Sequence, residues 1–264
     1  MTETAAKQKR PNYGIDAPAA VRNLILGGVA ALVLAVVSYL FDWGLTRMAT
    51  GIAIGWLGVA GWMVWDSKVG KLWSRDRLLD GLHLRGDETV LDVGCGRGLL
   101  LIGAAKRLTT GKAVGVDIWQ TEDLSGNRPE ATLENARLEG VAERVEVKDG
   151  DARRLPFADG TFDVIVTKDA LHNIYNAAER RTAVREIVRA LRPGGRLFIG
   201  DVRHTGQYMQ VLRECGVQDL RRSAESISSL LLGALSLGFV YPANVTARKP
   251  APAGGQGMGH SATT

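Results

Sequence analysis

Two long apolar stretches occupy the first quarter of the chain. They cover residues 24–41 (LILGGVAALVLAVVSYLF) and 48–65 (MATGIAIGWLGVAGWMVW), and neither contains a charged residue. Each is 18 residues long, close to the minimum for a helix that crosses the hydrocarbon core of a bilayer. The six residues between them, DWGLTR, leave room only for a tight reversal. The pattern therefore predicts an antiparallel transmembrane hairpin.

Neither a signal peptide nor a buried helical pair fits these stretches as well as a hairpin does. A signal peptide is disfavoured because the charged region before residue 24 is long and a second apolar stretch follows without a small-residue cleavage site. A buried helical pair in a soluble protein is disfavoured because neither stretch has a polar face. Gly51 and Gly55, with Gly58 close to the same face, form a small-xxx-small pattern that suits close helix packing in lipid, and a chance run of glycines in an apolar segment is the alternative. Aromatic residues that prefer the membrane interface fall near the predicted ends: Trp43, Trp62 and Trp65.

Basic residues flank the hairpin on both sides, and this predicts its orientation. The link between the helices contains a single basic residue, Arg47. An excess of positive charge marks the cytoplasmic side of a membrane segment, so both termini and the following domain are expected in the cytoplasm, at an inner or plasma membrane. The net charge of +5 then favours contact with anionic lipid headgroups over binding of nucleic acid. The two cysteines, Cys95 and Cys215, are expected to stay reduced there. The flanking charges are Lys7, Lys9, Arg10 and Arg22 before the hairpin, and Lys68, Lys71, Arg75 and Arg77 after it.

Beyond residue 78 the pattern changes to short apolar strands that alternate with helices. The predicted strands are TVLDVG, AVGVDI, RVEVKDGD, FDVIVTKDA and RLFIGDV, with two more near VQDLRR and NVTARK. The predicted helices are LLLIGAAKRL, PEATLENARLEG, AAERRTAVREIVRALRPGG and GQYMQVLRECG. Such alternation predicts an α/β fold, a parallel sheet with helices on both faces. The expected organisation is a basic segment 1–23, the hairpin 24–65, a basic juxtamembrane linker 66–77, an α/β domain 78–249 and a disordered tail 250–264.

The stretch VLDVGCGRG joins the first of these strands to the helix after it. Glycines in such a turn leave the backbone bare, so that a ligand can approach it at the start of the helix. Its glycines, Gly94, Gly96 and Gly98, are spaced G-x-G-x-G, and Leu99 stands where a dinucleotide fingerprint requires glycine. Asp92 lies immediately before the turn, where its charge would repel a pyrophosphate and attract a cation. S-adenosylmethionine (SAM) carries an ammonium and a sulfonium and has no phosphate. The charge therefore favours SAM over a nicotinamide dinucleotide.

Two further carboxylates follow the next two predicted strands. Asp117 ends the second strand, a position from which a carboxylate accepts ribose hydroxyls. Ile118 follows it and is expected to pack against the adenine. Asp151, after the third strand, is expected to accept the adenine amino group beside the Ala152 amide. A single acid in such a place is as readily a solvated loop residue, but three after successive strands indicate a binding site.

On these motifs the chain resembles the class I SAM-dependent methyltransferases of the small-molecule and quinone methyltransferase type. The matching stretches are VLDVGCGRG, VGVDI, DGDARRLPFADGTFDVIV, ALHNI and LRPGGRLFIGDV, over about residues 78–250. The resemblance implies a Rossmann-like, doubly wound, seven-stranded sheet whose last strand is antiparallel, with SAM as the cofactor. The hairpin lies outside the family core. The cofactor-binding positions expected in this sequence are Asp92, Gly94, Cys95, Gly96, Gly98, Asp117, Ile118, Asp151, Ala152 and Lys168.

Methyl transfer needs alignment of the acceptor and exclusion of water, with a base only if the acceptor arrives protonated. Candidate substrate-pocket residues follow the fourth and fifth strands, and we expect His172 first, then His204 and Asp201, to contact the substrate or act as base. The alternative for either histidine is a ring that only packs at the pocket wall. No spacing specifies a metal site. The other candidates are Lys168, Asp169, Asn173, Tyr175 and Arg203.

Two features keep more than one interpretation. Cys95 is expected to be a small residue that fits the turn rather than a nucleophile, because the sequence places no base to activate it. The apolar segment 227–241 is either a core element that closes the sheet or a lid over the substrate pocket.

The sequence predicts a membrane-anchored SAM-dependent methyltransferase of a small, lipophilic acceptor, with membrane lipid as its partner. Three alternative functions stay open: a methyltransferase of protein or RNA, a nicotinamide-dependent oxidoreductase, and a cofactor-binding module without catalytic activity.

Overall fold

The computed structural model describes residues 9–224 and 242–251. The segment 227–241 and most of the predicted tail lie outside these residues, so neither interpretation of that segment is tested. Within the described chain the elements alternate as the sequence pattern predicts, and two compact units are distinguished. The first contains residues up to 87 together with 95–149. The second contains residues 88–94 and everything from 150 onward.

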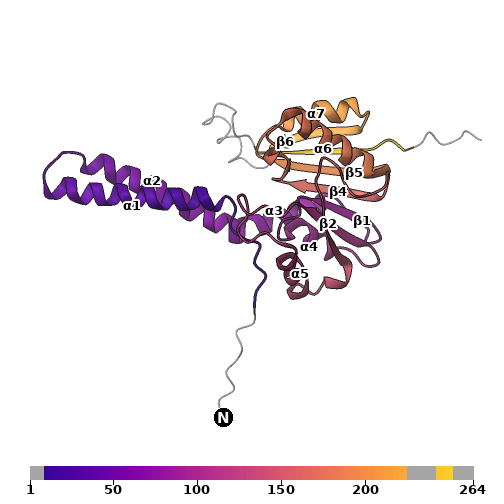
Figure 1. The fold of residues 1–264 in the computed structure, drawn as a ribbon, viewed down its shortest axis with the longest axis horizontal. Coiled ribbons are helices and arrows are strands. Elements are labelled where there is room, and N and C mark those ends of the chain that lie inside the picture. Colours follow the sequence, from indigo (N-terminus) through magenta and orange to yellow (C-terminus); the bar gives the residue numbers. More distant parts are fainter. Residues whose placement is uncertain (1–8, 225–241, 252–264) are drawn as a thin grey trace, which may run out of the picture. The chain divides into compact units, whose positions relative to one another are not determined.

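The predicted hairpin forms two long helices, α1 (Pro18–Leu40) and α2 (Thr46–Trp65). They lie side by side as an antiparallel pair (Figure 1). The reversal between them is closed by the buried Ser38, whose Oγ accepts hydrogen bonds from the Leu45 amide at 2.9 Å and the Thr46 hydroxyl at 3.2 Å. These polar groups of the turn are therefore satisfied within the hairpin itself.

The small residues that bring the two helices together are not those that the sequence pattern indicated. A Cβ placed on Gly51, Gly55 or Gly58 would meet nothing within 4 Å, so these glycines do not lie in the helix contact. The small-residue packing that their spacing suggested is therefore not formed between α1 and α2. Gly28 of α1 does pack closely, with a Cβ there falling 2.7 Å from Leu57 Cγ. On α2 the buried positions are the alanines, Ala49, Ala53 and Ala60, which also have helical spacing.

The segment predicted as a linker is helical and continues α2. A π-helical turn (Asp66–Gly70) leads into α3 (Lys71–Gly81). Leu79 of α3 is fully buried, and a Cβ on Gly103 of the next helix would lie 2.5 Å from its Cδ1. Because α3 packs closely in this way, the hairpin joins the rest of the first unit through a continuous and partly buried helix.

Seven strands form one sheet in the order β3-β2-β1-β4-β5-β7-β6. Strand β7 runs antiparallel to both β5 and β6, while the other observed pairings are parallel. The predicted seven-stranded sheet with an antiparallel last strand is confirmed. The strands are β1 (Thr89–Val93), β2 (Lys112–Asp117), β3 (Val145–Asp149), β4 (Phe162–Lys168), β5 (Leu191–Asp201), β6 (Gln218–Ala224) and β7 (Ala243–Arg248).

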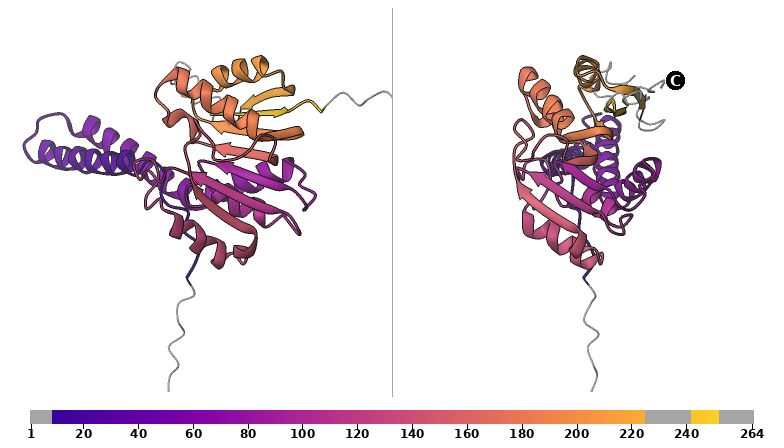
Figure 2. Two further views of the ribbon diagram at one scale, coloured as in Figure 1. Left: turned by 45° about the vertical axis from the view of Figure 1, so that its right-hand side comes forward. Right: turned by 90° about the vertical axis from the view of Figure 1, so that its right-hand side faces the viewer.

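Helices pack on the strands of each unit. In the first unit α4 (Leu99–Ala105) lies on β2, and α5 (Pro129–Leu138) lies on β3. In the second, α6 (Ala177–Ala190) contacts β5, and α7 (Thr205–Glu214) contacts β6 and β7 (Figure 2). The core strands β1 and β4 are apolar and largely buried on both faces, as expected for the centre of a parallel sheet.

Helix α6 begins and ends for identifiable local reasons. Asn176 caps it by accepting hydrogen bonds from the amides of Ala178 and Glu179, which contributes about 1 kcal/mol of stability. It ends at Ala190, before Pro193, which the sequence indicated as the end of this helix, because Arg192 precedes the proline and is disfavoured in helical geometry. Residues 191–195 instead form the irregular beginning of β5.

Candidate functional site

The three glycines of the turn between β1 and α4 all have positive φ, at 73° for Gly94, 53° for Gly96 and 85° for Gly98. Side chains would also have no room there. A Cβ on Gly94 would lie 2.3 Å from the Cβ of Ala170, and one on Gly96 would lie 2.8 Å from Leu124 Cδ2. The bare backbone expected from the sequence is therefore required by both conformation and space.

The Cys95 side chain is directed toward β2 and the core, and its Sγ also lies 3.9 Å from the Gly96 carbonyl oxygen. It is buried, and its Sγ lies where a Cβ on Gly115 of β2 would come within 2.7 Å. Its amide donates to the Val116 carbonyl at 3.2 Å. The side chain is a packing group that ties the turn to β2, which confirms the expectation that it fits the turn.

Asp117, at the end of β2, organises the turn directly. It is buried, and its Oδ2 accepts the Gly96 amide at 2.7 Å. Its Oδ1 accepts the Trp119 amide at 2.6 Å and the Asn127 side-chain amide at 3.2 Å. A carboxylate has about four acceptor positions, so about one remains for a further donor. If Asp117 bound both hydroxyls of a ribose, one of its three hydrogen-bond donors would have to move away. Asn127 is the most distant of the three.

Trp119, which follows Ile118, was not singled out from the sequence. Ile118 itself is 53% exposed, which leaves its side chain accessible to a ring. Trp119 has a φ of 62°, and its indole Nε1 donates to Asp149 Oδ1 at 2.6 Å. This hydrogen bond links the ends of β2 and β3. The left-handed backbone conformation of Trp119 is unusual for a bulky residue and marks it as a residue of interest, but no sequence pattern indicates that conformation.

The remaining predicted cofactor residues belong to the second unit. Asp92 is buried in β1, in register with Val166 of β4. Asp151 lies two residues beyond β3, and its hydrogen bonds from the Arg153 side chain hold its pKa below the usual range. Ala152 is half-buried. Lys168, the last residue of β4, pairs with Asp169 at 2.9 Å.

A buried carboxylate lies against the imidazole of His172. Asp201, the last residue of β5, has a fully buried side chain, and its Oδ1 lies 2.7 Å from His172 Nδ1. Its Oδ2 accepts the backbone amide of His172 at 3.1 Å. The imidazole is 22% exposed. A carboxylate at Nδ1 orients the ring and stabilises its protonated form, so Nε2 on the opposite side is the nitrogen suited to receive a proton.

Tyr208 of α7 completes this arrangement and was not predicted. Its hydroxyl donates to Asp201 Oδ2 at 3.0 Å, and its side chain is fully buried. Burial, reinforced by the adjacent carboxylate, raises the pKa of Tyr208, so the hydroxyl keeps its proton. The sequence placed it only within a predicted helix.

The other residues predicted near the substrate fall into different environments. His204 is exposed at the start of α7, and partial burial of its ring, followed by the nearby Arg180, lowers its pKa. Tyr175 is 93% exposed. Asn173 lies in the short helical turn that contains His172, and the Arg203 amide donates to Asp201 at 3.4 Å. In residues 9–224 and 242–251 no three His, Cys, Asp or Glu side chains are arranged to hold a metal ion.

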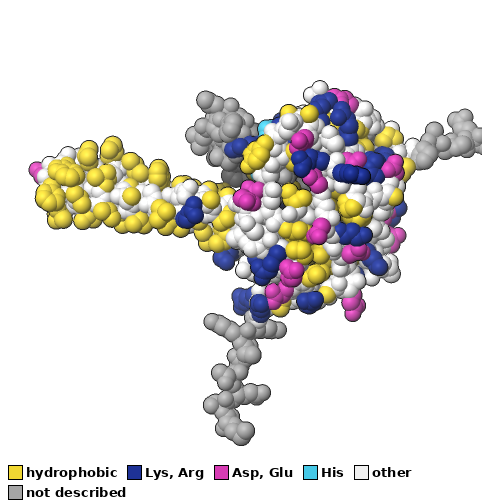
Figure 3. Space-filling view, in the orientation of Figure 1, with side chains coloured by type: hydrophobic (Ala, Val, Ile, Leu, Met, Phe, Trp, Pro, Cys, Tyr) yellow, Lys and Arg dark blue, Asp and Glu magenta, His cyan; other side chains and the backbone are white. Residues whose placement is uncertain are grey.

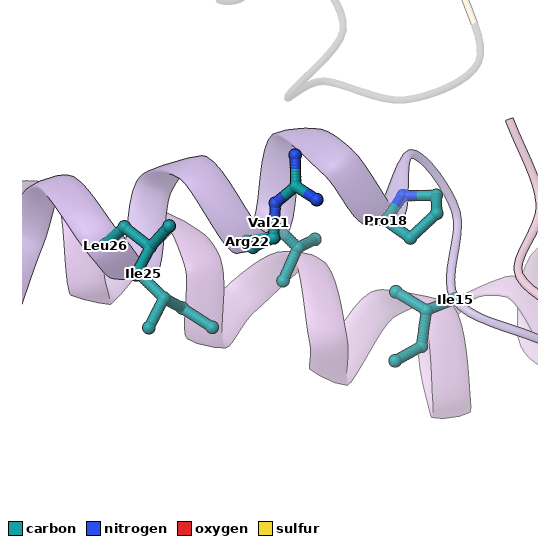
Figure 4. Close-up of a pocket in the computed structure, with 6 residues that line it drawn as sticks. All are labelled: Ile15, Pro18, Val21, Arg22, Ile25 and Leu26. Atoms are coloured by element: carbon teal, nitrogen blue, oxygen red, sulfur yellow. The ribbon is translucent and has the colours of Figure 1, made fainter. Parts of the chain in front are cut away.

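A groove of about 240 Å³ lies at the beginning of α1. Its lining is apolar apart from one arginine, and the groove contains none of the predicted site residues (Figure 4). We therefore do not assign it to the catalytic chemistry. The lining residues are Ile15, Pro18, Val21, Arg22, Ile25 and Leu26.

Comparison with known proteins finds similarity to methyltransferases over part of the chain. Residues 91–199 match the family model for a methyltransferase domain. The 27-O-demethylrifamycin SV methyltransferase of Amycolatopsis mediterranei is 36% identical over 126 residues, 48% of this chain and 43% of that protein. The ubiquinone/menaquinone biosynthesis C-methyltransferase UbiE of Roseobacter denitrificans is 33% identical over 129 residues, 49% of this chain and 48% of that protein. The chain thus spans less than half the length of these relatives.

The fold is also that of solved methyltransferases. Geranyl diphosphate C-methyltransferase from Streptomyces coelicolor, solved with Mg²⁺, geranyl diphosphate and S-adenosylhomocysteine, superposes with a TM-score of 0.54 at 15% identity. The match covers 67% of this chain and 78% of that one. At this identity the likeness establishes the fold, and the site residues are argued from their own geometry.

Proposed function

Because residues 91–199 carry a methyltransferase domain of the class I, SAM-dependent type, we propose that this protein transfers a methyl group from SAM to a small, lipophilic acceptor at a membrane. The observation that carries the proposal is the bond between Asp117 and the glycine turn, where a buried carboxylate fixes a backbone that has no room for side chains. We assign the ribose to Asp117 and the adenine face to Ile118. We assign the ammonium to Asp92 and the adenine amino group to Asp151.

The residues present suit SAM better than a dinucleotide. Asp92 is a buried acid immediately before the glycine turn, where a carboxylate does not suit a pyrophosphate. Asp117 suits a ribose of either cofactor and does not decide between them. SAM supplies a methyl group on a sulfonium, a carbon that is already activated for in-line displacement. The protein then has to hold the acceptor in line and remove a proton where the acceptor carries one.

His172 is the base in this proposal. Asp201 orients its imidazole through Nδ1 and stabilises the positive charge that develops when Nε2 takes a proton from the acceptor. Tyr208 donates to the same carboxylate and holds it in place. Asp201 and Tyr208 act through His172 and are positioning residues.

The hairpin is the support for membrane anchoring. The most apolar 18-residue windows of the helices Pro18–Leu40 and Thr46–Gly81 have mean hydropathies of 2.2 and 1.4, and only 17% of each window is buried. A core helix of a soluble protein would be mostly buried. Apolar side chains cover the visible face of the hairpin (Figure 3), and Val33, Leu26 and Ile54 are 57%, 61% and 68% exposed. Transfer of this surface from water to lipid is strongly favourable.

A labelling experiment tests the membrane topology. In a Cys215→Ser background, Trp43→Cys places a thiol in the hairpin turn and Asp87→Cys places one at an exposed site of the domain. We expect an impermeant maleimide added to intact cells to label the first variant and to leave the second unlabelled until the membrane is opened. Equal labelling of both, or of neither, in intact cells contradicts a hairpin that spans the membrane with its termini inside.

A transfer assay tests the activity and its acceptor class. The full-length protein in nanodiscs is incubated with SAM labelled at the methyl group and with a membrane-lipid and quinone extract, a protein extract or RNA. We expect label in the lipid extract. Label in protein or RNA alone would replace the lipophilic acceptor, and label in no fraction would favour a binding module without activity.

A further inference from the structure

Residues 9–17, which precede α1, form an extended strap along α5. The Asn12 amide donates to Asn135 Oδ1 at 2.9 Å, and Asn135 Nδ2 donates back to the Asn12 carbonyl at 2.9 Å. The Tyr13 hydroxyl donates to Glu139 at 3.0 Å. Tyr13 is 7% exposed, so this is a packed contact and not a loose surface one. The sequence predicted only a basic leader at this place.

The strap also holds the loop that follows β2. The Ile15 amide donates to the Ser125 hydroxyl at 2.8 Å, and the Ser125 amide donates to the Ile15 carbonyl at 3.2 Å. The Ala17 amide donates to the Asp123 carbonyl at 2.9 Å. The same loop carries Asn127, which donates to Asp117. The strap therefore fixes a loop whose other contacts reach the predicted cofactor carboxylate.

Arg97 joins the strap to the glycine turn. Its Nε donates to the Asn12 carbonyl at 2.6 Å, and its Nη1 donates to the carbonyls of Ser125 and Gly126. Its own carbonyl accepts Asn135 Nδ2 at 3.0 Å. Because Arg97 stands between Gly96 and Gly98, displacement of the strap removes a fixed point in the middle of the turn.

Leu124 fills the space between the strap and the turn. A Cβ on Gly14 would lie 2.7 Å from Leu124 Cδ1, and a Cβ on Gly96 would lie 2.8 Å from Leu124 Cδ2. One side chain thus packs against both backbones. Movement of the strap would open a gap beside Gly96, whose amide is bonded to Asp117.

The other end of the strap is fastened to the base of the hairpin. The Lys71 side chain is only 9% exposed, and its Nζ donates to the carbonyls of Tyr13 and Gly14 and to the Asp16 carboxylate at 3.0–3.2 Å. The Asp16 amide donates to Ser67 Oγ at 3.1 Å. Ser67 lies in the π-helical turn between α2 and α3, so the strap connects to the hairpin at α1, which follows it in the chain, and at the end of α2.

We infer that this strap is a positioning element of the cofactor site, which fixes the glycine turn and couples its geometry to the base of the membrane hairpin. The inference rests on the proposed function, since it assumes that the glycine turn and Asp117 bind SAM. Its consequence is specific: a change at Lys71, which is not in the turn, weakens cofactor binding and leaves the chemistry of His172 unchanged.

The test compares Lys71→Met with the matched control Lys148→Met, on exposed strand β3, in full-length protein in nanodiscs. Lys71→Met removes the charged donor from two carbonyls and a carboxylate and keeps an unbranched side chain that is one atom shorter. We expect the Kd for S-adenosylhomocysteine and the KM for SAM to rise about tenfold, with kcat within twofold of wild type. The control should leave all three constants unchanged.

Amide hydrogen exchange separates this effect from general destabilisation. In Lys71→Met, exchange should rise at residues 95–98 and 119–127 and stay at the wild-type level over 183–188 of α6. Tyr13→Phe, which removes the hydroxyl bond to Glu139 and the interaction of the hydroxyl with Arg75, should shift the Kd in the same direction by about threefold and covers the case that Lys71→Met does not fold.

The outcomes are distinguishable. If wild type binds S-adenosylhomocysteine and both strap variants bind it equally well, the strap inference is wrong and the proposed function stands. A loss shared by Lys148→Met, or faster exchange over the whole domain, also overturns the inference. If wild type itself does not bind, the proposed function fails first.

Discussion

Two buried carboxylates, one in each unit, end strands of the same sheet but differ in their partners. Asp117 ends β2 and accepts hydrogen bonds from two backbone amides and one side-chain amide. Asp201 ends β5 and contacts an imidazole and a phenol as well as backbone amides. None of the partners of Asp117 titrates near neutral pH, whereas His172 beside Asp201 is of a type that does.

In the proposed function, this difference separates a carboxylate that shapes the cofactor-binding turn from one that orients the base His172. The partners of Asp117 fix backbone geometry, so its loss should appear in cofactor affinity. The partners of Asp201 include the ring of His172, which the carboxylate orients and stabilises when charged, so its loss should appear in the rate of the chemical step. Four substitutions test whether the two carboxylates can be told apart in this way.

His172→Ala removes the proposed base. For an acceptor that arrives protonated we expect kcat to fall about a thousandfold, the middle of the range for general base catalysis, with the KM for SAM within threefold of wild type. Steady-state kinetics with the identified acceptor measures both constants. His83→Ala, at an exposed histidine before β1, serves as the control. A fall of less than fivefold would show that His172 only packs at the pocket wall.

Asp201→Asn keeps the shape of the side chain and removes its charge. We expect kcat to fall about a hundredfold because the imidazolium loses its counter-charge and the ring its fixed tautomer. The double variant with His172→Ala should be no slower than His172→Ala alone, since the two residues act as one unit. Additive losses would mean that Asp201 acts on the substrate directly.

Asp117→Ala removes the carboxylate that holds the glycine turn. Loss of charge-assisted hydrogen bonds of about 2 kcal/mol predicts a rise of about thirtyfold in the Kd for S-adenosylhomocysteine. At saturating SAM, kcat should stay within threefold of wild type. Calorimetry and kinetics on the same preparation give both numbers, and a loss confined to kcat would contradict the assignment of Asp117 to the cofactor.

Tyr208→Phe removes one donor from Asp201 and keeps the ring packed. We expect kcat to fall about threefold and the free energy of unfolding to fall by about 1 kcal/mol, the usual net value of one hydrogen bond. Thermal unfolding of wild type and variant in the same detergent checks the stability. A fall in kcat as large as that of Asp201→Asn would show that Tyr208 contacts the substrate.

The sequence predicted the succession of strands and helices along the chain. The apolar runs of the strands are short and bounded by turn residues, and they alternate with segments whose apolar residues recur at helical spacing. It also predicted that the glycine turn must be bare and that Cys95 packs. These features depend on residues close together in sequence, where local conformation and residue type determine the structure.

The contacts that the sequence did not reveal depend on packing between elements. Tyr208 reaches Asp201 from α7, the strap reaches Arg97 across more than eighty residues, and the hairpin packs through Ala49 and Ala53 rather than through Gly51 and Gly55. Small residues on both faces of α2 have the same spacing, so the sequence pattern does not decide which face meets α1. Rotation of the helix, set by packing, decides it.

The proposed function depends on which cofactor the protein binds. Calorimetric titration of the full-length protein with SAM, S-adenosylhomocysteine and NADH measures that binding directly. We expect the first two to bind with one site per chain and NADH not to bind. Binding of NADH alone would contradict the charge argument from Asp92, and with it the methyltransferase function.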